Sequence, residues 1–333
     1  MTTTTTTSTT RWSSSRDAAG AGVEGSFPSL LMSQPQLHFM ESDTVLVTDY
    51  DDNVLADVDA SSSSKMATHK FSPSHPHGIL HRAFSVFLFD ANTSEMLLQK
   101  RASTKITFPN VWTNTCCSHP LAGMDPPESE LEFGEGECGD GDGDGDGDGE
   151  GNKVRGAKNA AIRKLRHELG IPSSELSHEA GVRVKYLTRV HYWAADTVTH
   201  GPGSPWGEHE IDYILFVTVP DKSTITLDGA NDDEVDEVRW VDRDRMREMF
   251  DDESLLFSPW FRIVANRWLM GGGDGAGVGG GGDGGEGAKG GWWDDLDRTM
   301  NTDDYCDHVA IHRFDPPLEH MGGAGDAGPL FLN

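Results

Sequence analysis

Alternating apolar and polar positions predict several strands in this chain. The stretch 81–90, HRAFSVFLFD, alternates and is rich in aromatic and apolar side chains, which is typical of a strand. A turn at 91–94, ANTS, separates it from 95–102, EMLLQKRA, so the two segments predict a β-hairpin. The run 212–219, DYILFVTV, predicts a buried strand, and the alternating 235–242, VDEVRWVD, predicts another.

Helical spacing dominates three other segments. In 159–171, NAAIRKLRHELGI, apolar residues recur every four positions and a glycine follows as a stop signal. A second helix starts in 242–250, DRDRMREMF, and 257–270, FSPWFRIVANRWLM, is amphipathic after its proline. Strands mixed with two or three helices predict an α/β or α+β sandwich.

Three stretches break this pattern and carry little apolar sequence. Residues 1–40 are rich in Ser and Thr, and 134–152 and 271–291 are rich in Gly and acidic residues. Such sequences bury too little apolar surface to offset the entropy lost on ordering, so we expect disorder in all three. The first stretch also has the composition of a transit peptide. We therefore expect one domain at 41–270 and a C-terminal segment at 292–333.

Charge and cysteine content narrow the class of partner. The chain has 333 residues and a formal net charge of -28, which argues against nucleic acid and anionic membranes as partners. No apolar run approaches the roughly 20 residues of a membrane span. Four cysteines, two of them adjacent, do not predict a disulfide framework and favour a reducing compartment.

The stretch 114–121, NTCCSHPL, sets two thiols beside an imidazole. Neighbouring cysteines rarely bond to each other because the ring they would close is strained. Lys100, Arg101 and Lys105 come shortly before them, which in so acidic a chain suits a phosphate or diphosphate. An ordinary surface strand explains these cations equally well. A disulfide, a metal site, a nucleophile and an acid/base thiol all remain open here.

The stretch 206–217, WGEHEIDYILFV, brings carboxylates into a strand. Because side chains alternate along a strand, Glu208 and Glu210 face one side and His209 faces the other. Two carboxylates on one face of a buried strand are costly unless a cation lies between them, whereas a solvated strand end would carry no such cost. Imidazole ligands added to carboxylates would suit Zn, Mn or Fe. Spacing does not choose among the candidate histidines, which are His69, His75, His77, His81 and His119.

The helical stretch 163–171, RKLRHELGI, resembles the end of a Nudix box, REUxEExGU, in which U is aliphatic. Lys164 and His167 occupy two of the glutamate positions, and Arg155 occupies the upstream one. Only Glu168 remains. A Nudix hydrolase needs those carboxylates to gather metal ions and activate water, so most of the hydrolytic apparatus is missing.

Five segments together resemble type I isopentenyl-diphosphate isomerases of the eukaryotic kind. They are HRAFSVFLFD, KITFPNVWTNTCCSHPL, WGEHEIDYILF, FSPWFR and WWDDL. The resemblance implies a single catalytic domain with a Nudix-like mixed β-sheet sandwiched by helices. It also implies conversion of isopentenyl diphosphate to dimethylallyl diphosphate by a 1,3-antarafacial proton shift, a step of isoprenoid biosynthesis. The alternatives are a Nudix-type diphosphate hydrolase and an inactive protein that only binds metal or diphosphate.

The resemblance assigns a role to each matching position. It implies that the Cys117 thiol acts on one face of the substrate, with Cys116 only a packed neighbour. Glu210 acts on the other face, with Tyr192 beside it. His69 is preferred to His75 and His77 because its distance from His81 resembles that in plant members. The implied metal ligands are His69, His81, His119, Glu208 and Glu210.

Two divalent ions belong to the implied mechanism. Zn²⁺, Mn²⁺ or Mg²⁺ would occupy the His/Glu site, and a second ion, Mg²⁺, would bridge the diphosphate to Glu168. The resemblance also implies that Trp260 presents a ring face that stabilises a cation. The partner is a small-molecule substrate, and we expect a monomer in the cytoplasm, with plastid or mitochondrion as alternatives. The implied diphosphate contacts are Lys65, Arg101, Lys105 and Ser118.

Overall fold

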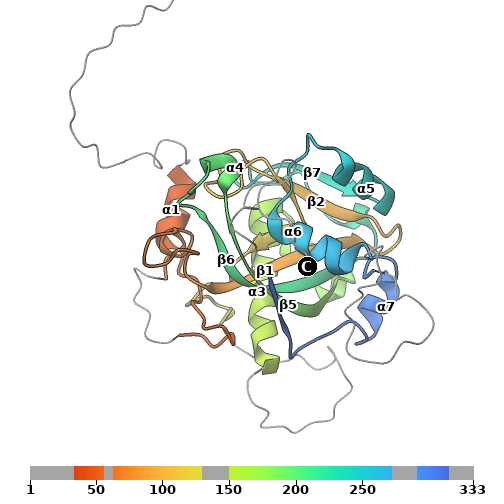
Figure 1. The fold of residues 1–333 in the computed structure, drawn as a ribbon. Helices are drawn as coiled ribbons and strands as arrows, with labels where there is room; N and C mark the ends of the chain where they lie inside the picture. Colours follow the sequence, from red (N-terminus) through yellow and green to blue (C-terminus); the bar gives the residue numbers. More distant parts are fainter. Residues whose placement is uncertain (1–33, 56–62, 130–149, 272–290, 315–333) are drawn as a thin grey trace, which may run out of the picture.

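The computed structural model describes four stretches of the chain (Figure 1), which are residues 34–55, 63–129, 150–271 and 291–314. Most of the predicted tail at 1–40, of the insertion at 134–152 and of the linker at 271–291 lies outside these described residues. The end of the predicted segment 292–333 lies outside them as well.

Two long neighbouring strands form the centre of a mixed sheet. β1 (His81–Asp90) and β6 (Gly207–Val219) run parallel, and His81 lies opposite Glu210 at the start of their register. Every residue of both strands is buried, as expected for strands covered on both faces. The described residues form an eight-stranded sheet in the order β3-β2-β1-β6-β5-β8, with β4 paired to β1 and β7 paired to β2. The other strands are β2 (Met96–Arg101), β3 (Trp112–Thr113), β4 (Cys116–Ser118), β5 (Arg183–Ala195), β7 (Val235–Val241) and β8 (Ile311–Phe314).

Alternating side chains of β1 face two separate cores. Phe87 belongs to the apolar cluster that includes helix α6 (Pro259–Val264). Its neighbour Val86 belongs to the cluster that includes helix α3 (Glu150–Leu169). The sheet therefore lies between helices on its two faces (Figure 1), and the predicted mixed sheet sandwiched by helices is confirmed.

Two helices differ in extent from their predictions. Helix α3 was predicted at 159–171 but begins at Glu150, so the last residues of the predicted insertion at 134–152 are helical. The single helix predicted at 257–270 is α6 followed by a π-helical turn at Ala265–Leu269. Two further α-helices are α4 (Thr197–His200) and α5 (Arg243–Asp251).

Two short helices precede β1 in the sequence and contribute side chains to a pocket at the start of β1 and β6. They are α1 (Gln34–Ser42) and α2 (Lys65–Thr68). Met40 of α1 is buried in a small apolar cluster with side chains of neighbouring segments. Residues 34–40 therefore differ from the tail predicted at 1–40, because they carry apolar side chains that pack against the domain.

The last described segment completes the same sheet. Helix α7 (Leu296–Asn301) leads to β8, which pairs in parallel with β5. Trp292 and Trp293 are buried in the cluster that includes α6, and the indole N–H of Trp293 donates to the carbonyl of Ser94 at 2.7 Å. In the described parts of the chain, no helix combines the length and the apolar character needed to cross a bilayer.

Candidate active site

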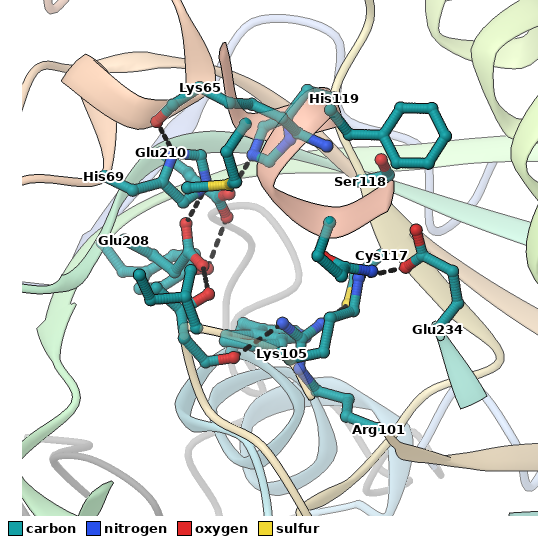
Figure 2. A pocket seen from close by; sticks show the side chains of 17 residues that line it. Lys65, His69, Arg101, Lys105, Cys117, Ser118, His119, Glu208, Glu210 and Glu234 are labelled. Atoms are coloured by element: carbon teal, nitrogen blue, oxygen red, sulfur yellow. Dashed lines mark hydrogen bonds and ion pairs between the residues drawn. The ribbon is translucent and has the colours of Figure 1, made fainter. Parts of the chain in front are cut away.

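A pocket lies where β1 and β6 begin, and 17 side chains line it (Figure 2). All of the predicted site residues line this pocket except His81 and Glu168. Figure 2 shows His69 and Glu208 on one side and Cys117 and Ser118 on the other. The fold thus gathers residues that lie far apart in the sequence around one cavity.

One side of the pocket is a buried cluster of five potential metal ligands, called here the metal cluster. Three of its members are imidazoles, which come from the start of β1, the segment after β4 and the end of α2. The other two are carboxyl groups of β6. One ligand atom from each of the five residues lies within 4.8 Å of the others. The members are His69, His81, His119, Glu208 and Glu210. The structure brings His69 into this cluster and leaves His75 and His77 outside it.

Two of the imidazoles are oriented by backbone carbonyls. His69 Nδ1 lies 2.8 Å from the carbonyl of Lys65, and His81 Nδ1 lies 2.7 Å from that of Ile79. With a metal ion bound, a proton on each Nδ1 would leave the Nε2 lone pair for the ion, as in metal-binding histidines. His81 Nε2 is buried and has no hydrogen-bond partner among the described residues. This donor set fits a divalent metal ion.

The electrostatics of the imidazoles agree with that fit. Burial lowers the pKa of His81 to about 3, and the neighbouring His69 adds to the effect. Burial, followed by His81 and His69, holds the pKa of His119 well below its usual value. These two rings are therefore neutral, which is the form that binds a metal.

The two carboxyls of β6 differ in protonation. Burial alone would raise the pKa of Glu208, but His69, whose Nε2 lies 2.9 Å away, brings it to about 2. Burial raises the pKa of Glu210 well above its usual value, and the charge of Glu208 raises it further. Two neighbouring carboxyls with diverging pKa values are a common acid/base arrangement. In the absence of a metal ion, Glu210 is therefore the carboxyl of this pair that binds a proton more readily.

Hydrogen bonds fix both carboxyl groups in place. The hydroxyl of Thr107 donates to Glu208 Oε1 at 2.8 Å. Glu210 Oε1 lies 2.8 Å from His119 Nε2, and the Tyr192 hydroxyl donates to Glu210 Oε2. Tyr192 thus lies beside Glu210 as predicted from the resemblance.

The opposite side of the pocket carries the thiol of Cys117. An Arg101 guanidinium nitrogen lies 3.5 Å from Cys117 Sγ, and the same guanidinium donates to the carbonyls of Phe108 and Thr107. Burial raises the pKa of Cys117 to about 12, although the charge of Arg101 opposes this. The thiol is protonated in this state. The Arg101 guanidinium beside it would stabilise the thiolate.

The adjacent cysteine points into the core instead. Successive side chains of β4 face opposite sides, so Cys116 is completely buried in the cluster that includes α3. Its thiol lies 3.4 Å from Glu168 Oε2. The two neighbouring thiols therefore have different environments, and only Cys117 reaches the pocket.

Glu168 does not lie in the pocket lining, in contrast to its predicted role at a second ion. Its Oε1 lies 3.0 Å from the Lys164 ammonium, and its Oε2 accepts from Gln99 Nε2 at 3.2 Å. With Cys116 also bonded to Oε2, the carboxylate is already satisfied by protein groups. The predicted role of Glu168 as a ligand of Mg²⁺ stays a prediction.

A group of charges next to Cys117, called here the cationic wall, consists of Lys65, Lys105 and Lys164, with Glu234 between the last two. Lys65 and Lys105 were predicted as diphosphate contacts, whereas the positions of Lys164 and Glu234 were not predicted. Glu234 is 4% exposed and lines the pocket. Lys105 and Glu234 lie 129 positions apart in the chain, so no local pattern connects them.

Comparison with known proteins defines the class and then the family. Residues 151–261 match the NUDIX domain family, which agrees with the sheet and helix arrangement. The isopentenyl-diphosphate delta-isomerase of Candida albicans is 40% identical over 280 residues, which cover 84% of this chain and 81% of that protein. The enzyme of Phaffia rhodozyma is 39% identical over 239 residues, covering 72% and 78% of the two chains. The isopentenyl-diphosphate delta-isomerase 1 of Bos taurus is 37% identical, covering 71% and 79%. The chain belongs to the isopentenyl-diphosphate delta-isomerase family, as the sequence motifs predicted.

Proposed function

We propose that this chain converts isopentenyl diphosphate to dimethylallyl diphosphate, with Cys117 and Glu210 as the two acid/base groups. The observation that carries the proposal is that one pocket holds a thiol beside a guanidinium on one side and, on the other, a carboxyl that accepts a hydrogen bond from the Tyr192 hydroxyl. Family membership supports the same reaction.

The chemistry requires two such groups. An unactivated alkene is a poor base, and its protonation produces a tertiary cation that water would trap. One acid must therefore add a proton on one face while a base removes another proton from the opposite face, in a pocket that excludes water. In the forward direction Glu210 donates, with Tyr192 bonded to it, and Cys117 accepts. Cys117 must first lose its proton, and the charge of Arg101 favours the resulting thiolate. In the reverse direction the two roles are exchanged.

An aromatic wall supports the cationic stage. Trp260 is buried and lines the pocket, and its indole N–H donates to Asn114 Oδ1 at 3.2 Å, which fixes the ring. The edge of Phe108 contacts it at a centroid distance of 5.4 Å. We propose that the Trp260 ring stabilises the developing cation through its negative face.

The diphosphate fits the cationic side of the pocket. Lys65, Lys105 and Ser118 line it, and their ammonium and hydroxyl groups suit anionic phosphate oxygens. Arg101 also lines the pocket, although two of its nitrogens already donate to backbone carbonyls. We propose that it serves the thiol and the substrate together.

The metal cluster would hold one divalent ion, for which Zn²⁺, Mn²⁺ and Mg²⁺ are the candidates. Such an ion supplies fixed positive charge that orients the two carboxyl groups of β6. Glu168 would be a ligand of the second ion, Mg²⁺, that accompanies the diphosphate. For the assembly state we propose a monomer. For the compartment we propose the cytoplasm, as the cysteine content of the sequence suggests.

Incubation of the metal-replete protein with isopentenyl diphosphate, followed by product analysis, tests this function. Dimethylallyl diphosphate is the expected product. Release of phosphate or pyrophosphate without isomerisation would establish the hydrolase instead. Binding of the substrate without any conversion would contradict both enzymatic functions.

A further inference from the structure

Three ammonium groups are crowded on the cationic wall. The side chains of Lys65, Lys105 and Lys164 are only 14%, 15% and 6% exposed. Burial, and then the charge of Lys164, lowers the pKa of Lys65 to about 8. Buried cations are costly unless an anion lies close to them, so this part of the pocket requires negative charge.

In the described structure Glu234 supplies much of that charge. Its carboxylate pairs with the Lys105 ammonium and lies 3.8 Å from the Lys164 ammonium and 3.9 Å from His167 Nδ1. Burial would raise the pKa of Glu234, but the charges of Lys105, Lys164 and Lys65 hold it well below its usual value. Among the carboxylates of the pocket lining, it is the one outside the metal cluster.

The loop that carries Glu234 is held at a fixed position. The amide of Asn231 donates to the carbonyl of Glu168 at 2.9 Å, and Gln36 of α1 donates to the carbonyl of Asp233 at 2.7 Å. Thr104 donates to the same carbonyl at 3.3 Å. Because the backbone is fixed by these bonds, the carboxylate itself is open to substitution without rebuilding the loop.

We propose that the Glu234 carboxylate substitutes for the diphosphate in the ligand-free enzyme, holding the Lys105 ammonium group where phosphate oxygens will bind. The inference rests on the proposed function, which supplies the diphosphate. Carboxylate and phosphate oxygens make the same charge-assisted bonds to ammonium groups, so one can replace the other. Once the substrate is bound, Glu234 repels it, which weakens binding of substrate and product alike.

The test uses Glu234→Gln, which keeps the shape of the side chain and removes its charge. We expect inorganic pyrophosphate to bind this variant about tenfold tighter than the wild type by titration calorimetry. The ligand-free variant should unfold at a lower temperature, because its ammonium groups lose their partner. Saturating pyrophosphate should remove most of that difference. The KM for isopentenyl diphosphate should fall, while kcat should not rise.

Glu128→Gln is the matched control. Glu128 is 3% exposed and pairs with Arg163, but it lies outside the pocket lining. This variant should lose thermal stability without any change in pyrophosphate affinity.

Weaker binding by Glu234→Gln would show that Glu234 helps to hold the ligand, and unchanged binding would show a purely structural ion pair. Either result overturns the inference while the proposed function stands. If neither the wild type nor the variant binds pyrophosphate, the proposed function fails as well. Should Glu234→Gln not fold, Glu234→Ala, which also removes the charge, gives the same decision: tighter binding supports the inference, and equal or weaker binding overturns it.

Discussion

The metal cluster and the cationic wall are two sides of one pocket with opposite electrostatic designs. The metal cluster directs imidazole lone pairs and carboxyls at a common centre, and the buried His81 Nε2 has no hydrogen-bond partner in the described structure. The cationic wall brings ammonium groups together, and the Glu234 carboxylate already lies close to two of them, those of Lys105 and Lys164. The metal cluster is arranged to bind a cation, whereas the cationic wall already contains an anion, the Glu234 carboxylate.

This difference matches what each side has to do. A metal ion that stays bound requires ligands aligned in advance, which the backbone carbonyls behind His69 and His81 provide. A diphosphate must bind and leave in every cycle. An internal carboxylate that takes its place keeps the empty pocket stable and prevents the product from binding too tightly.

The largest effect is expected from Glu210→Gln, which alters a residue of the metal cluster that also carries the reacting proton. General acid catalysis contributes about 10²–10⁴-fold, so kcat should fall by at least that much. Initial rates of isomerisation measure it, with thermal unfolding as the check on folding. A loss of less than about tenfold would remove Glu210 from the acid/base role.

Removal of a single imidazole should disable the metal cluster. His81→Ala is expected to lower divalent-metal affinity by about 10²-fold or more, since even outer-shell losses cost 10–100-fold. Equilibrium dialysis with metal analysis gives the affinity. His77→Ala is the control, because that ring stacks on Trp193 at a centroid distance of 3.9 Å, away from the cluster. Equal metal loss in both variants would contradict the ligand set.

The cationic wall should show a pH dependence that the metal cluster does not explain. Lys65, with a pKa lowered to about 8 by burial and by Lys164, is cationic below that pH and neutral above it. Pyrophosphate affinity should therefore fall as the pH rises through about 8. Lys65→Arg should bind with a smaller pH dependence, because a guanidinium remains charged. Identical pH profiles for the two proteins, measured by calorimetry, would exclude Lys65 from the anion site.

The smallest effect is expected from Cys116→Ala. This thiol is buried under α3 and does not reach the pocket, so kcat should stay within about threefold of the wild-type value. Urea unfolding should show a loss of about 1 kcal/mol, as for a small truncation in the core. A large loss of kcat with an intact fold would mean that the wrong cysteine of the pair has been assigned.

Much of the site was predictable because strands have a simple period. Alternation alone placed Glu208 and Glu210 on one face of β6. The resemblance then indicated which histidines are metal ligands. The parallel register of β1 and β6 explains why His81 lies opposite Glu210. Spacing could not separate His69 from its neighbours, since the end of α2 decides which ring faces the cluster.

Other features had no local signal. β5 was not predicted because nearly all of its residues are buried, so its apolar pattern has no clear period. β4 has three residues and β8 has four, too few for any periodicity. Glu234 meets its lysines only through tertiary folding. Lys164 lies beside Glu168 because the two side chains are one helical turn apart.

The most direct test of the central claim is proton exchange in D₂O by the wild type and by Cys117→Ala, followed by NMR with isopentenyl diphosphate as substrate. The account predicts that the wild type forms deuterated dimethylallyl diphosphate and that Cys117→Ala, folded and metal-replete, does not. Deuterated product formed by Cys117→Ala at a rate close to that of the wild type would contradict the assignment of Cys117 as the reacting thiol.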